Sequence, residues 1–213
     1  MSQARWNGGL VATGAAGIVV TSGLYGAAPA LAALPHAPLR LAEVCAATVE
    51  GASLLKAAGG VGLVGDVVLI AGAWLVTAAA LRGDRTRAAA GWAFVSLATL
   101  VFIGVDALAA GVLPQLAQSP AQLEGPRRLF DLLWVLGTVT FGVGGLLTVD
   151  GAVLRQAPVA ARVARVAAGV AVGSTLAFLV GVPAGLVMGL SIGFGAAAFA
   201  GLGVRMAQGR LTA

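Results

Sequence analysis

Long apolar runs separated by short connections dominate this chain and limit what it can fold into. A transmembrane helix needs about 20 predominantly apolar residues. Charged residues make up only 10% of the 213 residues, and hydrophobic types make up 59%, whereas a soluble domain carries roughly a quarter charged residues. The sequence therefore predicts an all-α fold, a polytopic membrane protein in which residues 1–213 form a single transmembrane domain. Its six expected spans cover about 10–34, 60–81, 88–113, 129–154, 164–181 and 184–206.

The first apolar run has two interpretations. Small residues at Ala28 and Ala30 resemble a signal-peptide cleavage site, but the apolar region of a signal is only about 7 to 15 residues long. The length of the run favours a retained first span over a cleaved one.

A more polar segment, about 38–56, follows the first run. Arg40, Glu43 and Glu50 fall near one helical face, and apolar residues such as Leu41 and Leu55 fall on the other. This pattern predicts a short helix lying in the membrane interface. An extramembrane helix packed on the bundle is the alternative.

The last apolar stretch is too long for one span. Pro183 lacks a backbone donor and disfavours helix at the residue before it, so we expect a tight hairpin of two spans. Small residues recur at intervals of four on both, which keeps them on one helix face and lets two backbones approach closely. The glycines expected to pack this hairpin, or to bind a partner subunit, are Gly169, Gly173, Gly185, Gly189 and Gly193.

The distribution of basic residues predicts the orientation. Cytoplasmic loops carry an excess of Lys and Arg. Nine arginines fall on the side of the termini (Arg5, Arg82, Arg85, Arg87, Arg155, Arg162, Arg165, Arg205 and Arg210), against Arg40, Lys56, Arg127 and Arg128 on the other side. Both termini are therefore expected in the cytoplasm, and the compact loops favour a bacterial inner (plasma) membrane.

Two aspartates lie within the second and third apolar runs. Asp66 follows the outer end of its span by a few residues, and Asp106 precedes the outer end of its own, so both are expected at the same depth, roughly 8 to 10 Å from the midplane at 1.5 Å per residue. Neighbouring antiparallel helices would let them meet. Thr77 and Thr99 share the helix faces of Asp66 and Asp106, respectively.

A charged aspartate at the centre of a membrane helix costs about 2.5 to 3.5 kcal/mol. The carboxyls must therefore be protonated, face a wet cavity, or hold a cation between them. Asp131, near the outer start of the fourth span, could join them. The alternative is that each aspartate is neutral and hydrogen-bonded, or is paired with Arg127, Arg128 or Lys56, and only fixes helix register. Asp150 is expected to form an ion pair with Arg82, Arg85 or Arg155.

The inventory of reactive side chains excludes several chemistries. His36 is the only histidine and Cys45 the only cysteine, so the chain lacks the ligands for a bis-histidine haem, a copper relay, a histidine-ligated di-iron site or a cysteine cluster. No cofactor or metal is expected, and the loop arginines do not form a nucleic-acid surface. Trp74 lies deep in its apolar run, so we expect its side chain to pack in the core.

The sequence favours a small transporter or ligand-binding membrane protein whose outward-facing polar site uses Asp66 and Asp106 for a proton or a small cationic or polar ligand. The alternative is an accessory or scaffold subunit that forms homo- or hetero-oligomers through the glycine faces of the last two spans. A lipid- or prenyl-processing enzyme is the weaker third possibility, because no metal-binding carboxylate cluster of familiar spacing is present.

Overall fold

A computed structural model describes residues 3–28, 41–182 and 184–211, and this part of the chain is helical without strands. Within these described residues, six helices are long and apolar enough to cross a membrane. They are α1 (Gln3–Ala27), α4 (Ala52–Arg82), α5 (Thr86–Ala107) with its extension through η1 (Leu108–Val112) and α6 (Leu113–Leu116), α7 (Pro120–Thr148), α9 (Pro158–Leu179) and α10 (Gly185–Ala207). The expected all-α polytopic bundle is confirmed, and the chain is an integral membrane protein.

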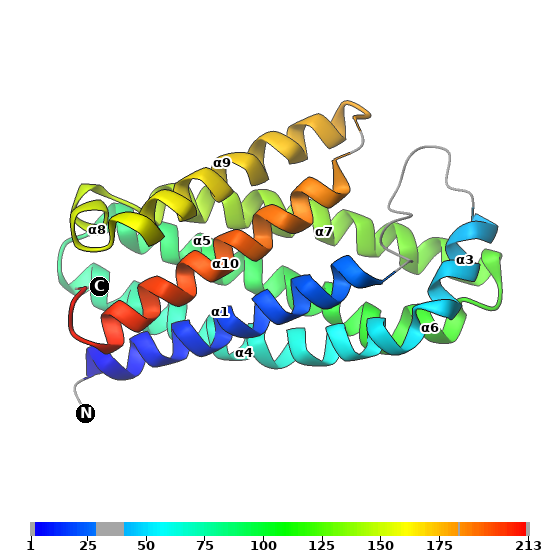
Figure 1. Cartoon of the computed structure of the whole chain (residues 1–213), viewed down its shortest axis with the longest axis horizontal. Helices are drawn as coiled ribbons and strands as arrows, with labels where there is room; N and C mark the ends of the chain where they lie inside the picture. The colour runs from blue at the N-terminus through cyan, green and yellow to red at the C-terminus, as the bar shows by residue number, and fades with distance from the viewer. Residues whose placement is uncertain (1–2, 29–40, 183, 212–213) are drawn as a thin grey trace.

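The contacts between the six long helices close them into a ring; Figure 1 shows the bundle from the side. The order around it is α1, α4, α5, α7, α9 and α10, and α10 packs back against α1. Side chains from α1, α5, α7 and α10 fill the centre with a continuous row of aromatic rings whose centroids lie 5.3 to 6.5 Å apart. The row consists of Tyr25, Phe130, Trp134, Phe102, Phe141, Phe199 and Trp92.

The two ends of the bundle differ. The N- and C-termini lie at one end with α8 (Gly151–Gln156), here called the terminal end, and α3 (Leu41–Glu50) and α6 lie at the opposite end (Figure 1). α3 contacts α4, α6 and α7, so it packs on the bundle. The expected helix over 38–56 is shorter, because Gly51 separates α3 from α4; residues 38–40 lie outside the described residues.

Several helix limits differ from the expected spans. α1 begins at Gln3 rather than near residue 10 and ends at Ala27, and residues 29–34 of the expected span lie outside the described part. α7 begins at Pro120, where the fixed φ of proline suits the first turn of a helix, and ends at Thr148 because Val149 is extended. The polar segment before residue 129 is therefore largely helical, and the expected fourth span is displaced toward the N-terminus.

Asp150 begins a new helix at the terminal end. Its Oδ1 accepts the backbone N–H groups of Ala152 and Val153, which caps α8, and its Oδ2 accepts from Arg85 at 2.9 Å. Burial alone would raise the pKa of this carboxyl, but the Val153 N–H, the Arg85 guanidinium and the Ala152 N–H together lower it below its usual value. The expected ion pair with Arg85 is confirmed.

Close helix contacts are made by glycines of α1, α4 and α10. A Cβ on Gly17 would lie 2.8 Å from Cα of Gly65, and a Cβ on Gly203 would lie 2.8 Å from the carbonyl oxygen of Gly8. Real side chains do not approach so closely, so any larger residue would push the helices apart. These glycines let α1 pack tightly between α4 and α10.

The outer surface of the ring is strongly apolar. Large side chains such as Val64, Leu132 and Phe194 are more than half exposed, as expected where helices face hydrocarbon. Trp74 is 65% exposed, so the expectation that it packs in the core is wrong. Its indole faces outward because Gly72, Ala73 and Val76 form the buried face of this turn of α4.

Candidate functional site

Asp66 of α4 and Asp106 of α5 meet inside the ring. Their side chains are only 1% and 3% exposed, and the two carboxyl groups lie close enough to interact directly. A carboxylate can only accept, whereas a protonated carboxyl can donate. Two adjacent carboxylates in such buried surroundings would repel each other, so the pair is suited to share a proton.

Tyr25 of α1 completes this group. Its hydroxyl donates to Oδ1 of Asp106 at 2.5 Å, across 81 positions of the chain. The sequence alone does not single out Tyr25, because nothing in the local pattern of α1 indicates which residue on α5 it will meet. We call Tyr25, Asp66 and Asp106 the acid cluster.

Two glycines of α4 make room for Asp106. A Cβ on Gly62 would overlap the carboxyl group of Asp106. A Cβ on Gly59 would overlap backbone atoms of Asp106 and Ala110. Gly62 is four residues before Asp66, so both face Asp106 from the same side of α4. This spacing places the carboxyl of Asp66 next to the space that Gly62 leaves for Asp106.

The helix that carries Asp106 changes its geometry one residue later. Residues Leu108–Val112 form a π-helical segment, in which the N–H of Leu113 bonds to the carbonyl oxygen of Leu108. Such segments are rare and often occur at functional sites. Here the segment lies against Gly59, and it follows directly the turn that presents Asp106.

An aromatic wall adjoins the acid cluster. The ring of Tyr25 meets Phe130 and Trp134 edge-on, at centroid distances of 6.4 and 6.2 Å, and these two rings stack on each other at 6.3 Å. Nε1 of Trp134 is buried without an acceptor among the described residues. The wall fixes the ring of Tyr25 and keeps this side of the cluster apolar.

Asp131 belongs to a separate ion pair. Nε of Arg127, a residue only 1% exposed, donates to Oδ1 of Asp131 at 3.0 Å on the same helix. The guanidinium also lies over the ring of Phe130 at 5.6 Å. Asp131 is thus held by Arg127, one of the partners expected if the aspartates only fix helix register.

The two threonines do not join the acid cluster. The hydroxyls of Thr77 and Thr99 donate to carbonyl oxygens one turn earlier on their own helices, at 2.8 Å in each case. At 1.5 Å per residue, Thr77 lies about 16 Å along α4 from Asp66, and Thr99 lies about 10 Å along α5 from Asp106. Both hydroxyls are satisfied locally.

The glycines of the last two spans occupy different surroundings. Gly169 and Gly173 are exposed, and a Cβ on either would meet nothing within 4 Å. A Cβ on Gly189 would lie 3.7 Å from Trp134, and one on Gly193 would lie 3.3 Å from Ser22 of α1. Gly185 is half-buried at the start of α10. Within the described chain, Gly169 and Gly173 do not bring two helices together.

The acid cluster lies deeper in α4 than the sequence suggested. α4 begins at Ala52 rather than near residue 60, so Asp66 is about 21 Å from the start of its helix and close to the helix midpoint. The carboxyl pair is therefore enclosed by the ring of helices. No protein-family model, curated protein or solved structure matches this chain.

Proposed function

We propose that this protein is a small membrane transporter or ligand-binding membrane protein in which the acid cluster binds and releases a proton in exchange for a small cationic or polar ligand. The observation that carries the proposal is the direct contact of Asp66 and Asp106 inside the ring of helices. Intramembrane carboxyls are costly, and functional sites are the default explanation for them.

The chemistry of the pair suits exchange. One shared proton neutralises one charge, and the Tyr25 hydroxyl satisfies Oδ1 of Asp106. Oδ2 of Asp66 is buried and receives no amide or hydroxyl donor from the described residues. This oxygen is the position where a second proton or a cation would be stabilised most, because nothing else there offsets its buried charge.

We further propose that the terminal end faces the cytoplasm of a bacterial-type cell. Nine arginines lie at this end, in short loops and helix ends of the kind for which the positive-inside rule holds. Both termini at one end fit an even number of spans (Figure 1). Under this orientation the end that carries α3 and α6 faces the outside of the cell.

Proton-coupled flux in proteoliposomes tests the proposal. The purified protein is reconstituted into liposomes that contain a pH-sensitive dye. An inward or outward gradient of sodium, potassium or tetramethylammonium is then imposed across the liposome membrane. The wild type is expected to move protons against at least one of these cations. Asp66→Asn and Asp106→Asn are expected to abolish the movement, because an amide cannot exchange a proton. Thr140→Val, which removes a buried hydroxyl bonded within α7, serves as the control and is expected to keep it.

A second candidate function is supported by Gly169 and Gly173. They give α9 an exposed small-residue face, the kind of surface on which membrane helices associate. If the aspartate variants keep every measured property of the wild type while Gly169→Leu or Gly173→Leu releases a partner subunit, the protein is an accessory or scaffold subunit and the transport proposal is wrong.

A further inference from the structure

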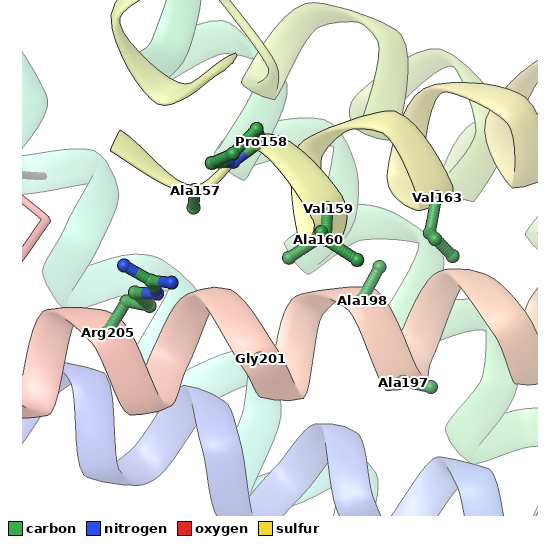
Figure 2. Close-up of a pocket in the computed structure, with 9 residues that line it drawn as sticks. All are labelled: Ala157, Pro158, Val159, Ala160, Val163, Ala197, Ala198, Gly201 and Arg205. Carbon is green, nitrogen blue, oxygen red and sulfur yellow. The ribbon is translucent and has the colours of Figure 1, made fainter. Parts of the chain in front are cut away.

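A groove separates α9 and α10 at the terminal end of the bundle. It has a volume of about 360 Å³ and is lined almost wholly by alanine, valine and glycine, with Arg205 as its one charged residue. Figure 2 shows Arg205 at one end of the groove and Val163 and Ala197 at the other. From Ala197 to Arg205 the groove follows α10 for about 12 Å.

The groove opens onto the surface that faces the membrane. Val163 and Ala197 are exposed, and Gly201 is half-buried. A Cβ on Gly201 would lie 3.5 Å from Cβ of Ala160 across the groove, so the floor is narrow and smooth. Its apolar lining and its opening toward the bilayer suit a hydrocarbon chain.

Arg205 supplies a positive charge at the mouth of the groove. One of its N–H groups donates to the carbonyl oxygen of Gln156 at 3.2 Å, and within the described residues no carboxylate pairs with it. The terminal end holds nine arginines, whereas its only carboxylates among the described residues are Asp84 and Asp150, and Asp150 is paired with Arg85. The charge around the groove is therefore complementary to an anionic ligand.

We propose that this groove binds one anionic glycerophospholipid. The headgroup phosphate lies on the guanidinium of Arg205, and one acyl chain follows the groove past Gly201 toward Val163 and Ala197. Basic positions between transmembrane helices are suited to anionic headgroups, and the apolar length of the groove is unsuited to a free phosphate. The proposal is independent of the acid cluster, which lies on other helices.

Lipid retention measured by native mass spectrometry tests the proposal. The protein is released from micelles that contain equal amounts of phosphatidylglycerol and phosphatidylcholine. One phosphatidylglycerol is expected to be retained in preference to phosphatidylcholine. Arg205→Gln is expected to weaken retention about fivefold, corresponding to about 1 kcal/mol for one arginine at an anionic surface. Arg82→Gln removes the same charge from the same end outside the groove and is the matched control.

Filling the groove tests the acyl-chain contact. Gly201→Leu is expected to lower retention of phosphatidylglycerol, and Gly173→Leu, the same change at an open position of α9, is expected to leave retention intact. If Gly201→Leu does not fold, Ala197→Phe fills the same groove from an exposed position. Equal retention of both lipids, equal loss in Arg82→Gln, or competition by soluble glycerol phosphate as strong as by lipid would each overturn the proposal.

Discussion

The hydroxyl of Tyr25 donates to Oδ1 of Asp106 at 2.5 Å and joins α1 to α5 across the interior of the ring. The two helices are not neighbours in that ring, because α4 lies between them. The bond reaches the carboxyl of Asp106 beside Gly62, whose added Cβ would overlap that carboxyl. Tyr25 is 4% exposed, so bulk water is a poor substitute for this bond.

Tyr25→Phe is expected to destabilise the protein by about 1–3 kcal/mol, because it leaves a buried carboxyl oxygen without its donor. The measurement is thermal or denaturant unfolding in a defined detergent. Ser174→Ala removes a buried hydroxyl that bonds only within its own helix and should cost less. Equal stability of Tyr25→Phe and wild type would contradict the role given to this bond.

Gly62→Ala is expected to disrupt the acid cluster, since the added methyl group would overlap the carboxyl of Asp106. Overpacking of this kind typically costs about 1–3 kcal/mol. The matched control is Gly60→Ala, two residues away, where a Cβ meets nothing within 4 Å and where replacing a helical glycine should be stabilising by up to about 1 kcal/mol. Both variants are compared by thermal or denaturant unfolding in the same detergent. If Gly62→Ala is as stable as Gly60→Ala, the acid cluster is not packed as described.

The sequence was sufficient to predict the helical bundle and the meeting of Asp66 and Asp106. Apolar runs of membrane-spanning length leave no other fold, and two acids at similar depth on successive antiparallel helices are within reach of each other. Their proximity is confirmed, while their function stays a prediction. Tyr25 was missed, because its position depends on how α1 packs on α4 and α10, which hydropathy alone does not encode.

The glycines illustrate the same limit. The regular spacing of Gly169 and Gly173 drew attention to α9, yet the close helix contacts within the chain are made by glycines such as Gly17, Gly65 and Gly203. Spacing by four shows that residues share a face, but it does not show which neighbour that face meets. A Cβ added to Gly193 would lie 3.3 Å from Cβ of Ser22 on α1. Gly193 is consequently part of the chain's own packing.

Gly65→Leu is expected to separate α1 from α4 and to abolish folding or cost more than about 3 kcal/mol, because a side chain there would meet the backbone of Gly17. Gly169→Leu adds the same side chain in open space and should leave the stability of the monomer nearly unchanged. Size-exclusion chromatography and thermal unfolding in detergent compare the two. A larger loss of stability in Gly169→Leu than in Gly65→Leu would contradict the helix order of the ring.

Asp150→Asn is expected to remove the ion pair with Arg85 while keeping the cap of α8, because asparagine is also a favourable N-cap residue. The loss should be about 0.2–1 kcal/mol near neutral pH, as for partly exposed pairs. The folded-state pKa of Asp150 is lowered, so its stabilising contribution is complete above the unfolded value of about 3.9 and declines as the pH falls through the folded pKa. The free energies of unfolding of wild type and Asp150→Asn, measured between neutral pH and about pH 3, should therefore converge as the pH falls. A difference in stability that grows with acidification would contradict the ion pair of Asp150 with Arg85.

The most direct test of the central claim is infrared difference spectroscopy of the carboxyl groups in the membrane-embedded protein. A carboxyl pair that shares a proton gives a carbonyl band of a protonated acid at neutral pH, and this band should be lost or shifted in both Asp66→Asn and Asp106→Asn but kept in Asp131→Asn, whose carboxyl is paired with Arg127. If the wild type shows only carboxylate bands from these residues, or if either aspartate can be replaced without changing the band of the other, then Asp66 and Asp106 do not share a proton and the proposed exchange site does not exist.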